Sequence, residues 1–260
     1  MRIESRSNEI IKRVRSLSSR KGRQEQGMHL AEGYKLVQEA LSSRMPITQA
    51  FIEDGSEGSE LEVALAESGT NVYTVSKHVM EAICQTKTPQ WVCAVVKTPK
   101  TEFPSHTPQQ GMLVALDTIQ DPGNLGTIIR TADAMGAKGV LLSEGCADAY
   151  SPKSIRSAMG STYHIPLWRV GLKEALQKLH IDGYCCICGH LQGQEALPHL
   201  TDRCVIVIGN EGSGVAEVIA ALCVPVRLPI YGRAESLNAS VAAGILMYEV
   251  AKAMHEHKKS

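Results

Sequence analysis

The stretch GMLVALDTIQDPGNLGTIIRTADAMGAKGVLLSE, residues 111–144, decides the fold class. It opens with an apolar run, GMLVALD, that is typical of a strand buried in a parallel sheet. The turn DPGN follows, and then a helix whose Ile128, Ala132 and Met135 fall on one face and which Gly136 ends. The next run, KGVLLSE, predicts a second strand. Such a strand–helix–strand unit belongs to an α/β fold with parallel strands.

The same alternation continues to the end of the chain. It predicts an open, mostly parallel sheet covered by helices on both faces, in a domain that spans residues 112–260. The further strands are TYHIPLW (162–168), GYCCICG (183–189), CVIVIG (204–209) and CVPVRLPI (223–230), and the further helices are 151–160, 171–180, about 215–221 and about 235–255.

A smaller α/β domain is predicted ahead of it, over residues 1–97. Residues 98–111 contain three prolines within KTPKTEFPSHTPQQG and show no apolar periodicity, so they predict a linker. In the smaller domain the patterns predict helices at 5–20, 32–43, 59–68 and 76–84, and strands at ITQAFI (47–52), NVYTV (71–75) and WVCAVV (91–96).

Composition limits the class of protein. An apolar fraction of 43% and a charged fraction of 21% are typical of a globular chain. No apolar run reaches the roughly 18 residues that cross a bilayer, and the first residues lack the apolar centre of a signal peptide. The eight cysteines lie mostly in apolar segments, where free thiols behave as small hydrophobes. We therefore expect a cytoplasmic protein with no membrane partner.

The charge is neutral overall but uneven. The formal net charge of zero argues against a general electrostatic binder of nucleic acid, yet residues 1–25 carry eight Lys or Arg against three Glu. A local basic patch can serve a specific RNA partner. Solvated helix faces explain the same charges equally well, so charge alone leaves both interpretations open.

Three loops rich in Gly, Asn and Ser follow predicted strands. They are DPGNLGTIIR (121–130), IGNEGSG (208–214) and LPIYGRAESLNASVAAG (228–244). In open parallel sheets ligands bind beyond the carboxyl ends of the strands. Three such loops on one edge of a sheet therefore predict a binding site.

The second loop and a cysteine-rich segment also allow other interpretations. Gly209, Gly212 and Gly214 do not have the G-x-G-x-x-G spacing of a dinucleotide loop, and Ser213 lacks the G-x-S-x-G frame of a nucleophile elbow. A simple tight turn stays possible there. In YCCICGH (184–190) a C-x-x-C pair stands close to a histidine, but a tetrahedral zinc site needs a second pair of ligands. A buried strand is favoured, and no metal is expected.

The three loops resemble the motifs of the SpoU/TrmH family of RNA 2′-O-ribose methyltransferases, within the SPOUT superfamily. The resemblance covers roughly residues 110 to 255, and the first 95 residues resemble the SpoU substrate-binding domain of many members, with HLAEGYKLVQEAL (29–41) as a marker. The matching positions are Asn124, Gly126, Arg130, Thr131 and Ala132 in the first motif, Gly209, Glu211 and Gly214 in the second, and Leu228, Pro229, Gly232, Ser236, Leu237, Asn238, Ser240 and Ala242 in the third.

The resemblance implies an activity, partners and a topology. It implies methyl transfer from S-adenosyl-L-methionine to a ribose 2′-hydroxyl, with 23S rRNA preferred over tRNA as the substrate. It also implies a homodimer and a deep trefoil knot in the C-terminal domain, although chain-tracing rules treat knots as nearly absent. Rival interpretations are methylation of a base nitrogen and a catalytically silent RNA-binding factor for ribosome assembly.

The resemblance also assigns residues to roles. Arg130 is expected to pair with a substrate phosphate and to stabilise the developing oxyanion, because a guanidinium does not lose its proton in proteins. The other catalytic candidates are Asn124, Glu211, Ser236 and Asn238. The residues expected to hold the cofactor are Gly189, Gly209, Leu228, Ile230 and Leu237, and those expected to contact RNA are Arg6, Lys12, Arg13, Arg20, Lys21 and Arg23.

Overall fold

The computed structural model describes residues 1–56, 58–200 and 202–257. The chain forms two compact units that do not follow a single cut in the sequence. The N-terminal unit contains residues 1–100 together with 148–163, and the C-terminal unit contains residues 101–147 and 164–260. Among the described residues, no helix is both long enough and apolar enough to cross a lipid bilayer.

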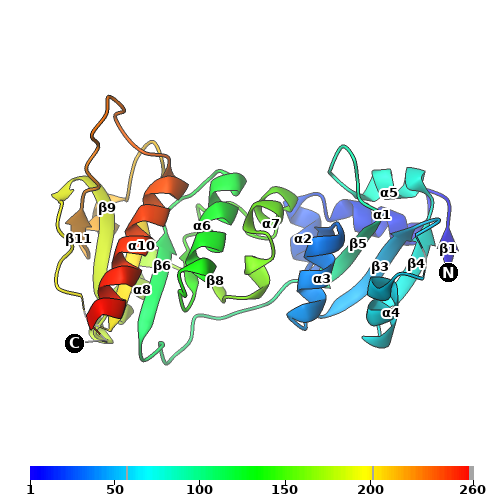
Figure 1. Ribbon diagram of the computed structural model, residues 1–260, viewed down its shortest axis with the longest axis horizontal. Helices are drawn as coiled ribbons and strands as arrows, with labels where there is room; N and C mark the ends of the chain where they lie inside the picture. Colours follow the sequence, from blue (N-terminus) through cyan, green and yellow to red (C-terminus); the bar gives the residue numbers. More distant parts are fainter. Residues whose placement is uncertain (57, 201, 258–260) are drawn as a thin grey trace. The chain divides into compact units, whose positions relative to one another are not determined.

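The C-terminal unit is built on a six-stranded sheet with the order β11-β9-β10-β6-β7-β8 (Figure 1). Every pairing in it is parallel, so the prediction of a mostly parallel sheet is confirmed. The strands are β6 (Gly111–Leu116), β7 (Val140–Leu142), β8 (Leu167–Arg169), β9 (Cys185–Gln194), β10 (Arg203–Ile208) and β11 (Val224–Val226).

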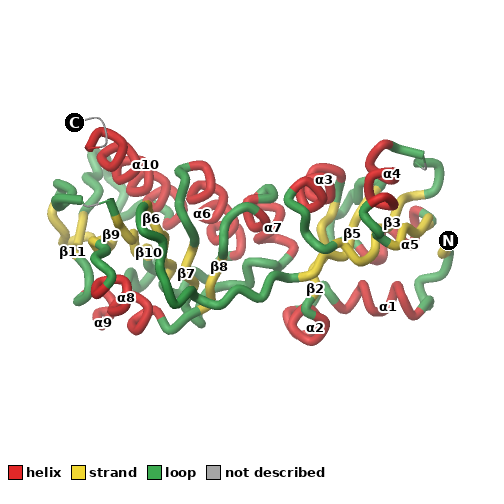
Figure 2. The backbone as a smooth tube through the Cα atoms, turned by 90° about the horizontal axis from the view of Figure 1, so that it is seen from below, coloured by secondary structure: helices red, strands yellow, loops and turns green. Residues whose placement is uncertain are grey.

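Helices cover both faces of this sheet (Figure 2). On one face α10 packs against α6, and on the other α8 packs against α9. Burial of the strands on both faces explains why β6 and β10 are continuous apolar runs. The helices are α6 (Pro122–Ala134), α8 (Leu172–Ile181), α9 (Glu217–Ala220) and α10 (Ala239–His257).

The central strands set where the loops meet. β6 pairs with β10 in parallel from Gly111 opposite Arg203 to Leu116 opposite Ile208. The two strands therefore end at the same level, and the loops after Leu116 and after Ile208 leave from the same edge of the sheet. The amide of Asp117 donates to the carbonyl of Ile208 over 2.8 Å, which extends the pairing by one step into these loops.

The N-terminal unit contains a mixed five-stranded sheet with the order β1-β4-β3-β5-β2. β3 pairs in parallel with β4 and antiparallel with β5. The predicted α/β class is confirmed here too. Its elements are β1 (Arg2–Ile3), α1 (Glu9–Ser16), α2 (Arg20–Gln26), β2 (Met28–Glu32), α3 (Tyr34–Ser42), β3 (Ile47–Glu53), α4 (Glu60–Glu67), β4 (Asn71–Val75), α5 (Lys77–Ile83), β5 (Val92–Lys97), α7 (Pro152–Ala158) and the short 3₁₀ turn η1 (Ser161–Tyr163).

Alternation along β3 builds a core on each face of this sheet. Phe51 joins the core under α1 and α5, whereas its neighbours Ala50 and Ile52 join the core under α3 and α4. Successive side chains of a strand point to opposite faces, so one strand supplies both cores.

The predicted helix over 5–20 is wrong in its extent. The chain forms two helices instead, because Ser19 caps α2 by accepting a hydrogen bond from the amide of Gly22 at 3.0 Å. A Cβ at Gly22 would lie 2.0 Å from the carbonyl oxygen of Ser16, so the close approach of the two helices requires glycine.

Strand β2 was not predicted from the sequence. It lies at the edge of the sheet and contains His29, whose polar side chain predicts a position at the surface. The structure buries this side chain completely, and the burial lowers the pKa of His29 to about 3. The neutral ring lies within hydrogen-bond distance of Thr98 (3.0 Å) and Tyr163 (3.1 Å).

Residues 148–163 pack into the N-terminal unit although they follow β7 in the sequence. Arg23 anchors them through Nη2, which lies 2.7 Å from Oδ2 of Asp148. Its Nη1 donates to the carbonyls of Leu17 (2.8 Å) and Ser18 (2.9 Å), and its side chain is only 7% exposed. Ile155 joins the core under α3 and α4. The predicted strand over 162–168 is reduced accordingly, since 161–163 form η1 and only β8 remains.

Replacing Arg23 should destabilise the N-terminal unit strongly. Arg23→Ala leaves Asp148 and two carbonyls without their buried cationic partner, and we expect the free energy of unfolding to fall by about 3–5 kcal/mol. Urea titration followed by circular dichroism measures this. The control is Lys21→Ala, which breaks an exposed pair of 3.7 Å with Glu25 and should cost less than about 1 kcal/mol. Equal losses in the two variants would contradict the anchoring role.

Candidate active site

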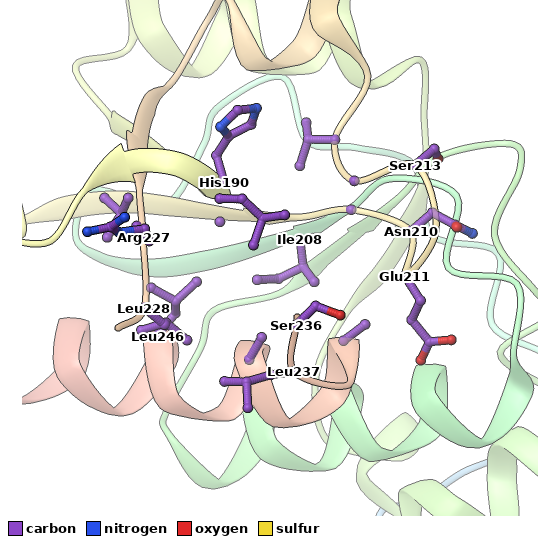
Figure 3. Close-up of a pocket in the computed structure, with 18 of the residues that line it drawn as sticks. His190, Ile208, Asn210, Glu211, Ser213, Arg227, Leu228, Ser236, Leu237 and Leu246 are labelled. Carbon is purple, nitrogen blue, oxygen red and sulfur yellow. The ribbon is translucent and has the colours of Figure 1, made fainter. Parts of the chain in front are cut away.

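Two of the three glycine-rich loops, 208–214 and 228–244, line one pocket in the C-terminal unit (Figure 3), and the first loop contacts them only at one end, through Asn124. The volume of the pocket is about 430 Å³, which suits a cofactor-sized ligand. The loops after β9, β10 and β11 and the start of α10 form its walls. It is lined by Gly189, His190, Leu191, Gln192, Ile208, Gly209, Asn210, Glu211, Gly212, Ser213, Gly214, Val215, Val226, Arg227, Leu228, Ile230, Ser236, Leu237, Ala239, Ala242 and Leu246.

One wall of the pocket is apolar. Leu246 belongs to α10, and Leu228 and Leu237 come from the segment that leads to this helix (Figure 3). At two glycines of the pocket the backbone passes close to neighbouring atoms of the protein. A Cβ on Gly209 would lie 2.2 Å from the backbone carbon of Gly214, and a Cβ on Gly189 would lie 3.2 Å from Cδ1 of Leu246. All five residues predicted to hold the cofactor, from Gly189 to Leu237, line this pocket.

A polar cluster stands at one end of the pocket and joins all three loops. Glu211 points from the second loop toward the N-terminal end of α6 (Figure 3). Nδ2 of Asn124, on α6, donates to Oε1 of Glu211, and Nδ2 of Asn238 donates to the same oxygen over 2.9 Å. The Asn238 Nδ2 also lies 3.2 Å from Oδ1 of Asn124. Three predicted catalytic residues, distant in the sequence, are thus in mutual contact.

Helix geometry fixes the two asparagines. Asp121 caps α6 by accepting from the amide of Asn124 at 2.9 Å, and Pro122 occupies the first turn. Asn238 precedes α10, and its Oδ1 accepts from the amide of Ser240 at 2.9 Å. Its side chain therefore starts a helix with its oxygen and binds Glu211 with its nitrogen.

A supporting frame behind the second loop was missed in the sequence. Asp117 is 8% exposed, and its Oδ2 accepts from the amide of Ala216 at 2.9 Å. Nδ2 of Asn210 donates to the carbonyl of Thr118 over 2.9 Å, and its Oδ1 accepts from the amide of Gly212 at 2.8 Å. These contacts tie both ends of the loop that carries Glu211 to the loop after β6. A carboxylate directly after an apolar strand was the available signal.

Ser236 and Arg130 have different positions. Ser236 lines the pocket from the third loop. Arg130 lies on α6, beyond Asn124, with an exposed side chain, and it does not line the pocket of its own chain. Within the described residues its guanidinium has no hydrogen bond or ion pair. Its neighbour Thr131 faces α10, since its Cγ2 lies 3.8 Å from the Cβ position of Gly244.

The predicted RNA-contacting residues lie on or near α1 and α2. Arg6, Lys12, Arg13, Arg20 and Lys21 are exposed. Lys12 pairs with Glu9 at 2.6 Å, and Nε of Arg6 donates to the carbonyl of His78 at 3.0 Å.

Arg23 is a correction to that set. Because its guanidinium is buried and held by Asp148 and two carbonyls, it cannot reach a phosphate.

The cysteine segment forms part of β9 and its core. Cys186 and Cys188 are buried, and all eight cysteines of the chain are free thiols. Burial raises the pKa of Cys186 to about 12, as expected for a thiol in apolar surroundings. Among the residues that the structure describes, no three His, Cys, Asp or Glu side chains are grouped to hold a metal ion.

A parallel α/β sheet with a pocket at the carboxyl ends of its strands is typical of α/β proteins that bind a ligand at that edge. Comparison with protein families identifies the family. Residues 111–248 match the model described as the SpoU rRNA Methylase family, and residues 8–94 match the MRM3-like substrate binding domain. The chain belongs to the SpoU rRNA methylase family, which confirms the resemblance seen in its motifs.

Individual relatives cover nearly the whole chain. The 23S rRNA (guanosine(2553)-2′-O)-methyltransferase RlmP of Bacillus subtilis (strain 168) is 37% identical over 253 residues, which cover 95% of this chain and 98% of that protein. The AdoMet-bound rRNA methyltransferase from Sinorhizobium meliloti superposes with a TM-score of 0.89 at 32% identity, covering 97% of both chains. The SpoU methyltransferase AviRb from Streptomyces viridochromogenes, in complex with AdoMet, gives 0.82 at 26% identity, covering 94% of this chain and 97% of that one.

The close approach at Gly209 gives a direct test of the pocket. Gly209→Ala forces a Cβ into the backbone of Gly214, so the loop must shift, and we expect the free energy of unfolding to fall by about 1–3 kcal/mol. Gly232→Ala is the control, because a Cβ there meets nothing within 4 Å. Chemical denaturation of both variants measures the difference. A Gly209→Ala variant as stable as Gly232→Ala would show that the loop does not pack as described.

Proposed function

We propose that this chain is a methyltransferase that moves a methyl group from S-adenosyl-L-methionine to a ribose 2′-hydroxyl of rRNA. The preferred substrate is 23S rRNA, in line with the reaction named for the relative from Bacillus subtilis. The observation that carries the proposal is the contact of Asn124, Glu211 and Asn238 at the end of one pocket, because it joins the three family motifs in a single site.

The pocket fits S-adenosyl-L-methionine, which two of the structural relatives bind. Its apolar wall at Leu228, Ile230 and Leu237 suits an adenine ring, and the peptide groups of Gly189 and Gly209, which line the pocket, can bond the ribose and adenine edges. We propose these five residues as its binding set. When bound, the cofactor supplies a methyl group on a positively charged sulfur, which is already activated for transfer.

The residues of the chain then have to place the ribose and remove its proton. The displacement is in line: the bond from the 2′-oxygen to the methyl carbon forms as the carbon–sulfur bond breaks, and the hydroxyl proton leaves to water. Ser236 faces the pocket and can orient the hydroxyl. Glu211, fixed by two amides, holds the loop that shapes this space. Arg130 pairs with the adjacent phosphate and stabilises the developing oxyanion.

The position of Arg130 favours a homodimer. The exposed face of α10 carries Val241, Ile245 and Tyr248, which are 50%, 40% and 56% exposed and lie one helical turn apart. Such an apolar stripe beside α6 is suited to a second copy of the chain. In this dimer Arg130 serves the pocket of the partner subunit, because it does not line its own.

The path of the third loop favours the trefoil knot. β11 lies at the edge of the sheet, yet residues after it line the same pocket as the loops after β9 and β10, and α10 then packs against α6 near the centre. The C-terminal segment thus returns across the preceding loops, and we propose that it passes through them. An experimental structure traced through residues 208–240 tests this path.

The N-terminal unit is proposed to bind the RNA, with residues 1–97 as its main part, 98–111 as a linker and 112–260 as the methyltransferase domain. Arg6, Lys12, Arg13, Arg20 and Lys21 are exposed and would contact phosphates, which gives affinity and salt dependence more than sequence choice. An rRNA-modifying enzyme with eight free thiols fits the cytoplasm.

One assay separates this function from its rivals. The full-length protein is incubated with labelled S-adenosyl-L-methionine and unmodified rRNA or tRNA, and the digested nucleosides are analysed. We expect label in a 2′-O-methylated nucleoside from 23S rRNA. Label on a base would favour base methylation, label from tRNA alone would change the substrate, and no label on either RNA would favour a silent assembly factor.

Arg130 variants test the proposed role in catalysis. Arg130→Ala should lower kcat at least a hundredfold because it removes the charge that stabilises the oxyanion, a loss of about 2.7 kcal/mol or more. Arg130→Lys keeps the charge but not the fork of two N–H donors, so we expect intermediate activity. Calorimetric binding of S-adenosyl-L-methionine should stay within twofold of wild type. Full turnover in Arg130→Lys would contradict bidentate pairing with phosphate.

The dimer has its own test. Ile245→Glu places a charge in the apolar stripe of α10 and should convert the protein to a monomer with at most a few per cent of its methyl transfer, as measured by light scattering and the nucleoside assay. The control is Val218→Glu on α9, which is 61% exposed and lies on the opposite face of the sheet. It should stay dimeric and active. An active Ile245→Glu monomer would rule out a shared site.

A further inference from the structure

A second cavity lies in the N-terminal unit, apart from the proposed methyl-transfer pocket. Its volume is about 380 Å³, and it opens between the start of α3, the segment before β5, and α7. The side chains that matter for its chemistry are Tyr34, Lys35, Gln90, Arg156 and Met159.

The mouth of this cavity is held in a fixed shape. Oε1 of Gln90 accepts from the amide of Tyr34 at 2.8 Å, at the first residue of α3. Gly33, which precedes the helix, has φ +91° and passes so close that a Cβ would lie 2.8 Å from the same oxygen. Gln90 therefore occupies the first amide of α3, and the first turn of the helix, from Tyr34 to Leu36, lines the cavity.

The charges that line the cavity leave a positive excess. Glu32 is the acidic member, and its two carboxylate oxygens accept from the amides of Gln85 (2.9 Å) and Thr86 (3.2 Å). Nη1 of Arg156 lies 3.8 Å from Glu32, too far for a hydrogen bond, and this buried nitrogen has no hydrogen-bond partner in the described part of the chain. Lys35 is exposed at the rim. Arg156 therefore forms an ion pair with the buried carboxylate, and the two cations against one carboxylate leave one positive charge in excess for an anionic ligand.

Flat and flexible apolar groups stand beside these cations. Tyr34 is 39% exposed, and its ring lies 6.0 Å from that of Trp91, which supports it from one side. Met159 is 45% exposed and is held with φ +51° at the end of α7. An exposed aromatic ring that is braced from behind offers a stacking surface, and a methionine adapts to a second flat face.

We propose that this cavity binds one unstacked nucleotide of a single-stranded segment of the RNA substrate. The base stacks on Tyr34 against Met159, and its phosphate lies between Lys35, Arg156 and the N-terminus of α3. The combination of a stacking ring, two cations and fixed polar groups is the chemistry that recognises unpaired RNA. The proposal rests on the proposed function, because it takes RNA as the substrate, and it adds a site that reads a nucleotide other than the one methylated.

Binding of unmodified 23S rRNA transcript to full-length variants tests this site. Tyr34→Ala removes the stacking ring and should weaken the affinity about tenfold, whereas Tyr34→Phe keeps the ring and should bind within twofold of wild type. Lys35→Ala should weaken binding and reduce the slope of log Kd against log salt by about 0.7, the value for one phosphate of a single strand. Lys97→Ala, an exposed lysine outside the cavity, is the control and should change neither quantity.

The outcomes separate this site from the proposed function. Thermal melting and S-adenosyl-L-methionine binding are measured for each variant, and both should match wild type. If wild type methylates rRNA and Tyr34→Ala binds it as tightly as wild type, the nucleotide site is overturned and the methyltransferase stands. If Tyr34→Phe is as weak as Tyr34→Ala, stacking is overturned. If wild type binds rRNA yet transfers no label, the proposed activity fails and the affinities still decide the site.

Discussion

The site depends on one carboxylate oxygen that receives hydrogen bonds from two amides. Oε1 of Glu211 accepts from Asn124 and Asn238, which lie 87 and 27 residues away in the sequence. Each amide also belongs to a helix start, so the cluster fixes α6, α10 and the second loop against one another. Glu211 is exposed, so each bond is modest in energy, but the loss of either amide would remove a link between separate elements rather than a contact within one.

This constraint explains which parts of the site could be predicted. The glycine-rich loops were visible because parallel strands end at one edge and their loops must meet there, and the apolar runs of β6 and β10 located that edge. The frame formed by Asp117 and Asn210 was not predicted, although the place of Asp117 directly after an apolar strand was a signal. Its bonds run to backbone groups of Ala216 and Thr118, and no residue type at those positions reveals a backbone partner in advance. The position of Arg130 outside its own pocket could not be predicted either. A helical pattern predicts which face of the helix is buried, but not which residues lie near the exposed face.

The fold shows the same division between local and distant causes. Helices α3, α4 and α5 followed from local periodicity and lie close to their predicted bounds. Three features did not follow from periodicity: the break between α1 and α2, the edge strand β2 and the attachment of residues 148–163. Each depends on a contact that periodicity cannot report: Gly22 against a carbonyl, buried His29 against Tyr163, and Arg23 against Asp148. Tertiary contacts of this kind override local preference.

The burial of Arg23 also changes how the N-terminal unit can bind RNA. The sequence offers eight cations in its first 25 residues, but Lys12 and Lys21 pair with Glu9 and Glu25, and Arg2 pairs with Glu4 and Asp54. With Arg23 also committed, four of the eight, Arg6, Arg13, Arg15 and Arg20, have no ion pair within the described residues. A weak general attraction to phosphate would select poorly among the many segments of a large RNA. Selection then has to come from contacts that read an unpaired base, and a cavity with a braced tyrosine and two cations supplies such contacts where the surface charge does not.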